Sequence, residues 1–145
     1  MKRNEPNQNP SGSQTGLSAK ICRGDVFAVQ CPSRDVLKHV TSRWGVLILV
    51  ALLAGTHRFS DLRRKISGVS EKMLAQTLQW LESDGFVLRC AFPVQPPHVE
   101  YSLTPMGVEV AQLVESLADW IEMNMQRILE DKSLDRTERE AETPL

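Results

Sequence analysis

The sequence predicts a winged helix-turn-helix fold, which is mainly α-helical with a small β-hairpin wing (an α+β class) and an added C-terminal helix. Three observations predict it. Two short helices with capping residues are joined by a Gly-containing turn, a hairpin follows them directly, and apolar residues then recur at helical spacing over residues 105–129. The expected order is helix, helix, short extended segment, helix, turn, helix, hairpin, long helix.

The first two helices come before this motif. Pro32 follows Cys31 and suits a first helical turn, so a helix is expected to begin there. A second helix is expected over residues 43–54 and ends before Gly55, a usual residue after a helix. It is apolar on nearly all sides, which predicts a buried position in the middle of a small domain.

The next segment supplies the helix-turn-helix. Residues 57–59 are expected to be extended, Ser60 to cap a helix through about Ile66, and residues 67–69 to form a tight turn. Ser70 is expected to cap a further helix to about Ser83. Its buried stripe is predicted to consist of Leu74, Leu78 and Leu81.

Two strands are expected next, at residues 86–92 and 99–103, with a proline-rich hairpin loop between them. Cys90 is interpreted as a packing residue of the first strand. Thr104 and Pro105 then open the long helix, which is expected to reach about Leu129. Residues 1–24 are predicted to be a disordered arm, residues 25–129 one domain that includes a dimerisation helix at 105–129, and residues 130–145 an acidic flexible tail.

Composition narrows the function classes. The net charge of −1 means that any nucleic-acid contact must come from a local surface. The polar start of the chain and an apolar run of only residues 46–54 predict a cytoplasmic protein without a membrane partner. The three cysteines form no CxxC pair, and the three histidines have neither a metal-ligand spacing nor a paired nucleophile. We therefore expect no metal, no cofactor and no enzymatic activity.

The helix after Ser70 presents a polar face that could read duplex DNA. Lys72 and Gln76 lie one turn apart near its N-terminus, where Gln can pair with adenine and Lys can donate to guanine. Ser70 and the helix N-terminus can hold a phosphate. Trp80 also lies on the outward side, and packing against a neighbouring element is favoured over base stacking.

Basic residues around this helix are candidates for contacts with the DNA backbone. A run of Arg and Lys at residues 63–65 is also typical of an ordinary solvated helix face. The order of helices, turn and hairpin is therefore stronger evidence for DNA binding than this run. The predicted DNA-binding residues are Arg43, Arg58, Ser60, Arg63, Arg64, Ser70, Lys72, Met73, Gln76, Gln79, Arg89 and His98.

The last helix carries more apolar surface than one small domain can cover. Val110, Val114, Leu117, Ile121 and Ile128 recur at helical spacing. This surplus predicts a two-fold dimer through the helix, with a helix that folds back on its own domain as the alternative.

Six segments of the chain form a recognisable pattern, namely 31–37 (CPSRDVL), 43–49 (RWGVLIL), 58–66 (RFSDLRRKI), 69–74 (VSEKML), 81–85 (LESDG) and 93–107 (PVQPPHVEYSLTPMG). With them the chain resembles, over residues 31–121, the HxlR family of bacterial winged-helix regulators. The resemblance implies a homodimer through the first and last helices, and DNA binding through the helix after Ser70 and the wing. His98, Ala75 and Gln79 depart from the family pattern and suggest a different operator sequence.

Cys31 matches the position at which some HxlR members sense quinones, aldehydes or oxidants, so the resemblance implies an electrophile or oxidant effector. A thiol at a helix N-terminus has a stabilised thiolate and is more reactive. The alternative is that Cys31 is an inert, partly buried thiol. If Cys31 does react, Cys22 could serve as the resolving cysteine.

Together these observations predict a homodimeric DNA-binding transcriptional regulator, expected to be a repressor that binds an operator in double-stranded DNA. The alternative is a winged-helix protein-interaction module that has lost specific DNA binding. His98, Ala75 and the modest local charge favour this alternative slightly.

Overall fold

The computed structural model describes residues 25–142, so the predicted arm at residues 1–24 and Cys22 lie outside the described residues. The chain divides between Leu37 and Lys38 into two compact units. The described part of the first unit contains a turn region and the beginning of α2 (Pro32–Thr41). There Asp25 Oδ1 accepts a hydrogen bond of 3.1 Å from the Phe27 N–H, and Arg34 Nη1 donates one of 3.3 Å to the Phe27 carbonyl. The predicted helix start at Pro32 is confirmed.

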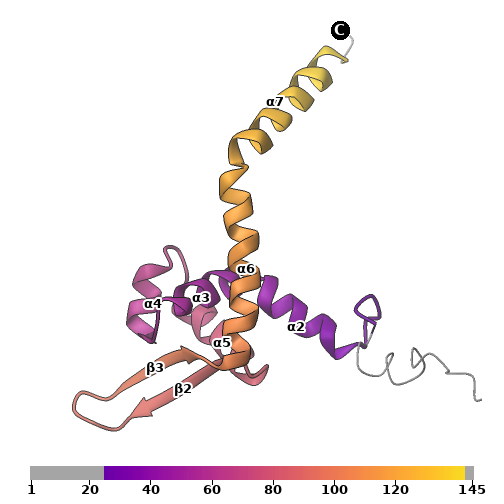
Figure 1. Ribbon diagram of the computed structural model, residues 1–145. Helices are drawn as coiled ribbons and strands as arrows, with labels where there is room; N and C mark the ends of the chain where they lie inside the picture. The colour runs from indigo at the N-terminus through magenta and orange to yellow at the C-terminus, as the bar shows by residue number, and fades with distance from the viewer. Residues whose placement is uncertain (1–24, 143–145) are drawn as a thin grey trace, which may run out of the picture. The chain divides into compact units, whose positions relative to one another are not determined.

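The second unit is built around α3 (Arg43–Leu53), against which α6 (Pro105–Met123) packs (Figure 1). The Ser42 side chain caps α3 by accepting from the Gly45 N–H at 3.1 Å. Ile48 and Leu49 are fully buried, which confirms the central position predicted for this helix. Within residues 25–142 no single helix is long and apolar enough to cross a membrane, and only the bent pair of α2 and α3 would qualify together, by length and composition alone.

The helix-turn-helix consists of α4 (Phe59–Lys65) and α5 (Glu71–Ser83). Leu62 of α4 and Leu74, Leu78 and Leu81 of α5 are buried, so the predicted apolar stripe is confirmed. Gly68 in the turn between the two helices has a φ of 87°, a conformation that side-chain-bearing residues rarely adopt. The apolar stripe and this turn together set the direction of α5.

A three-stranded antiparallel sheet lies beside these helices and contains β1 (His57–Arg58), β2 (Val87–Phe92) and β3 (His98–Leu103). The strand order is β1-β3-β2, with His57 opposite Tyr101 and Val87 opposite Leu103. The β2–β3 hairpin projects from the helices as a wing (Figure 1). The predicted hairpin is confirmed, with each strand boundary within one residue of the expected one.

The junction between the wing and α6 is closely packed. Thr104 caps α6 by accepting from the Gly107 N–H at 2.9 Å, and its hydroxyl donates to the Gly85 carbonyl at 2.6 Å. A Cβ atom at Gly107 would lie 1.9 Å from the Phe86 carbonyl oxygen, so only glycine allows this approach. The start of α6 is thereby fixed against the start of the wing.

Two predictions about local structure were wrong. Ser60 does not cap α4, because the helix begins two residues earlier than expected, at Phe59, with Arg58 as a cap residue whose side chain makes no capping bond. Residue 59 is therefore helical rather than extended. Cys90 is exposed rather than packed, because the face of β2 on which it lies has no layer covering it.

The end of the last helix was also predicted wrongly. Instead of one helix to about Leu129, α6 ends at Met123 and α7 (Met125–Ala141) continues beyond the expected end. Asn124, with φ −108° and ψ 8°, breaks the helix while its side-chain amide donates to the Trp120 carbonyl at 2.7 Å. No residue of α7 is buried. Contacts between residues four apart, such as Arg136 Nε to Glu140 Oε1 at 3.1 Å, lie along its surface.

Candidate DNA-binding interface

The polar face of α5 is exposed as the sequence predicted. Ser70 caps the helix by accepting from the Met73 N–H at 3.1 Å, and Met73 is half exposed. Lys72 is exposed and its ammonium group makes no ion pair with another described residue. Gln76 is half buried and lies one turn further along the same face, and Gln79 is exposed. An α-helix that presents such a face at its N-terminal end suits insertion into a major groove.

The two arginines of α4 form ion pairs with acidic residues. Arg63 Nη1 lies 2.6 Å from Glu71 Oε1, which joins α4 to the first turn of α5. Arg64 pairs with Asp61, and its guanidinium holds the pKa of that carboxyl below its ordinary value. Both pairs are exposed, so phosphates can compete for these cations at a small cost.

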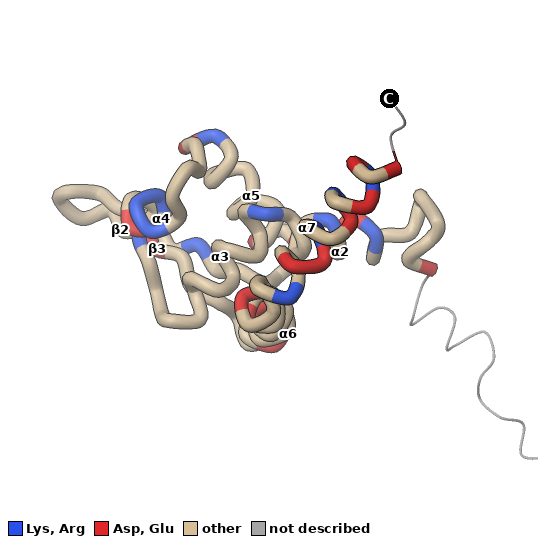
Figure 2. Tube along the Cα trace, turned by 90° about the horizontal axis from the view of Figure 1, so that it is seen from above, with Lys and Arg blue, Asp and Glu red and all other residues tan. Residues whose placement is uncertain are grey.

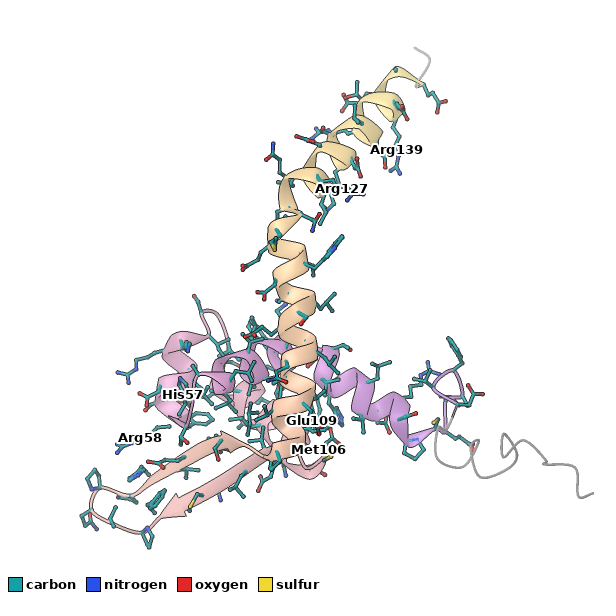
Figure 3. The ribbon with its side chains drawn as sticks, viewed as in Figure 1. His57, Arg58, Met106, Glu109, Arg127 and Arg139 are labelled. Carbon is teal, nitrogen blue, oxygen red and sulfur yellow. The ribbon has the colours of Figure 1, made fainter. Side chains whose placement is uncertain are left out.

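Arg58 lies between α4 and the wing, at the end of β1 (Figure 3). Figure 2 shows that basic residues gather on α4, whereas acidic residues are frequent along α7. The wing adds Arg89, which is exposed on β2. The second unit therefore concentrates cations near the helix-turn-helix although the chain as a whole has a net charge of −1.

Two other predicted DNA-binding residues have partners inside the protein. The His98 ring stacks on Phe92 with 4.9 Å between ring centroids, and its Nε2 lies 3.3 Å from Glu100 Oε1. The guanidinium carbon of Arg43 lies 5.3 Å from the centroid of the Trp44 ring, a cation–π contact. These contacts orient both side chains, and their role in DNA binding stays a prediction.

The structure reveals a cluster of three interacting side chains at the end of α5 that the sequence did not suggest. His39 of α2 stacks on Trp80 with ring centroids 5.0 Å apart and an angle of 9° between the rings. His39 Nδ1 also lies 2.6 Å from Asp84 Oδ2, at the C-terminal cap of α5. The preferred interpretation of Trp80 as a packing residue is confirmed. His39 and Asp84 are 45 residues apart in the chain, and no local pattern marks such a pair.

The two serines provide a test of how α5 is held. We expect Ser70→Ala to lower the free energy of unfolding by about 1 kcal/mol, because it removes the side-chain acceptor for an N–H in the first turn. Ser60→Ala is the matched control and should change it by less than about 0.5 kcal/mol, because Ser60 makes no cap. Urea denaturation followed by circular dichroism measures both. Equal losses in the two variants would contradict this assignment of the caps.

Cys31 lies directly before α2, and its Sγ is 2.8 Å from the Ser33 hydroxyl oxygen. Hydrogen bonding from the Ser33 side chain and backbone lowers the pKa of the thiol below its ordinary value. The sulfur is therefore held in an environment that favours its reactive thiolate form. Across residues 25–142, no group of three or more His, Cys, Asp or Glu side chains is arranged to hold a metal ion.

Two short helices joined by a tight turn, a three-stranded sheet and a projecting hairpin define a winged helix-turn-helix transcriptional regulator. The chain belongs to the HxlR-like helix-turn-helix family, whose pattern matches residues 39–129.

Several known proteins are similar to this chain. The HTH-type transcriptional regulator YtfH of Escherichia coli K12 is 70% identical over 117 residues, covering 81% of this chain and 93% of that protein. The solved structure of YtfH from Salmonella typhimurium is 69% identical, with a TM-score of 0.74 over 76% of this chain and 98% of that one. The redox regulator HypR in its reduced form is 32% identical, with a TM-score of 0.61 over 69% of this chain and 98% of that one.

Proposed function

We propose that this regulator binds a specific operator in duplex DNA as a homodimer and represses transcription there. The observation that carries the proposal is the N-terminal half of α5, where the unpaired Lys72 and the neighbouring Gln76 face away from the buried stripe. Because the proposed partner is chromosomal DNA, we place the activity in the cytoplasm.

The proposed contacts fall into two groups. Lys72 and Gln76 would read base edges, with Met73 and Gln79 beside them on the same face. The cap at Ser70 and the exposed cations would hold phosphates and position the protein without reading sequence. The residues assigned to this second group are Arg43, Arg58, Ser60, Arg63, Arg64, Ser70, Arg89 and His98.

The proposed dimer rests on an apolar stripe of α6 formed by Leu113, Leu117, Trp120 and Ile121. These side chains are between 41% and 71% exposed, although all four are large and apolar. Val114 on the neighbouring face is buried, so the same helix covers its own domain with one side and leaves the other uncovered. A second copy brought to this stripe, and to the exposed side of α2, would place two α5 helices for two half-sites.

Fluorescence anisotropy with duplex DNA from the chain's own upstream region tests the proposal. We expect tight binding that falls steeply as salt rises, and much weaker binding to a random duplex of equal length. Equal affinity for both duplexes, or no binding to either, would instead support the protein-interaction module. A reporter gene placed behind the bound sequence then gives the sign of regulation.

We further propose that an oxidant or electrophile modifies Cys31 and releases the DNA. The thiol at the start of α2 and its bond with Ser33 support this, as does the similarity to HypR, which is described as a redox regulator. Treatment with diamide or a quinone should release DNA from the native protein and not from Cys31→Ser. Release from both proteins would exclude this thiol as the sensor.

The pKa of Cys31 gives a prediction that is independent of DNA. In a background in which Cys22 and Cys90 are replaced by serine, alkylation of Cys31 by iodoacetamide should rise with pH at a lower midpoint than alkylation of a free cysteine. The reason is that hydrogen bonds from Ser33 stabilise the thiolate. Ser33→Ala should move the midpoint to higher pH, whereas Ser33→Thr, which keeps the hydroxyl, should restore it. A midpoint that does not move in Ser33→Ala would refute this role of the hydroxyl.

A further inference from the structure

A groove of about 440 Å³ lies between α3 and the C-terminal end of α4. Leu47, Val50 and Ala51 of α3 form one wall, and Lys65, Ile66 and Ser67 form the other. Its size falls within the range of sites that hold small molecules, which is roughly 300–1,000 Å³. The groove lies wholly inside the second unit and shares none of its lining with the α6 stripe.

The chemistry of the lining indicates what the groove would hold. Leu47 is 43% exposed, so it leaves an aliphatic surface open to solvent beside the groove. Lys65 is the one charged residue in the lining, and its ammonium group makes no ion pair with another described residue. The neighbouring cations Arg63 and Arg64 are already paired with acids. An aliphatic wall facing one unpaired cation suits a small apolar molecule that carries a single negative charge.

The groove also adjoins the turn that leads to α5. Ile66 and Ser67 come just before Gly68, and a Cβ atom at Gly68 would lie 3.9 Å from the Trp44 ring of α3. A molecule in the groove would thus touch both the central helix and the turn that precedes the cap at Ser70. Its negative charge would pair with Lys65 and so reduce the net positive charge of the basic run at residues 63–65 at the end of α4, which is proposed to face DNA phosphates.

We propose that this groove is a binding site for small aromatic or aliphatic carboxylates, and that their binding weakens the hold of the protein on DNA. The second half of the proposal rests on the proposed function, whereas the first half does not. By thermodynamic reciprocity, DNA must weaken carboxylate binding by the same factor.

Isothermal titration calorimetry without DNA tests the site, with 1-naphthoate as probe and the uncharged 1-naphthamide as its counterpart. Leu47→Gln should weaken both probes by about tenfold, because one aliphatic wall is lost. Lys65→Met should weaken only 1-naphthoate, by about fivefold, as expected for an exposed charge pair. Leu88→Gln, the same substitution at an exposed position on β2, should change neither. Equal 1-naphthoate affinity in the native protein and Leu47→Gln would overturn the site.

A DNA titration with and without saturating 1-naphthoate tests the coupling. We expect the native protein to bind its operator several-fold more weakly with 1-naphthoate, and Leu47→Gln to need about tenfold more 1-naphthoate for the same loss. An operator affinity that 1-naphthoate leaves unchanged in the native protein would overturn the coupling. Failure of the chain to bind DNA without any probe would overturn the proposed function instead, and calorimetry would still decide the site.

Discussion

Leu117→Glu is expected to convert the regulator from a dimer to a monomer at micromolar concentration. The side chain is 53% exposed in one chain and lies in the middle of the α6 stripe, so the proposed interface would bury it. A carboxylate placed there would lose its hydration in the dimer without gaining a partner. Because the interface is two-fold symmetric, this cost is incurred once in each chain. Dimerisation should weaken by at least about 100-fold, as for a central residue of an interface. Sedimentation should show the 16.3 kDa of one chain rather than twice that mass.

Gln112→Glu is the matched control for this prediction. It adds the same charge at an exposed position of α6, but on a different side of the helix from the apolar stripe. We expect it to remain a dimer. If Leu117→Glu were also a dimer, or if the native chain were a monomer under these conditions, the proposed interface would be wrong.

Lys72→Ala and Gln76→Ala are expected each to weaken operator binding by about 10-fold to 100-fold, the effect of losing one good base contact. Binding to random duplex should change much less, because base readout contributes little to it. The loss of specificity should be confined to one or two base pairs of the operator for each variant. Anisotropy titrations against operators with single substitutions measure this.

Lys132→Ala on α7 is the matched control for charge, since it removes one cation outside the proposed DNA surface. It should leave operator affinity within about twofold, as for most surface substitutions. If Lys72→Ala weakened all sequences equally and reduced the salt slope by about 1, Lys72 would contact a phosphate rather than a base. No effect of either α5 substitution would favour the protein-interaction module.

Elements whose signals are local could be predicted from the sequence. The cap at Ser70, the cap at Thr104 followed by Pro105 and the buried leucines of α5 each depend on residues within one or two turns. The failure at Ser60, in contrast, has a long-range cause. Ser60 has the right side chain for a cap, but pairing of β1 with β3 holds Arg58 in an extended conformation and starts α4 two residues earlier than expected.

Local residue patterns therefore specified the winged helix-turn-helix, the outward face of α5, the position of Cys31 before α2 and the family to which the chain belongs. Helix capping, hydrophobic periodicity and turn formation depend on residues that are close together in the chain, so they can be recognised in the amino-acid sequence. The contact of His39 with Trp80 and Asp84, the ion pair of Arg63 with Glu71 and the groove beside Lys65 came only from the tertiary structure. Each depends on how separate helices meet, and that geometry is fixed by the packing of the whole core rather than by any one segment.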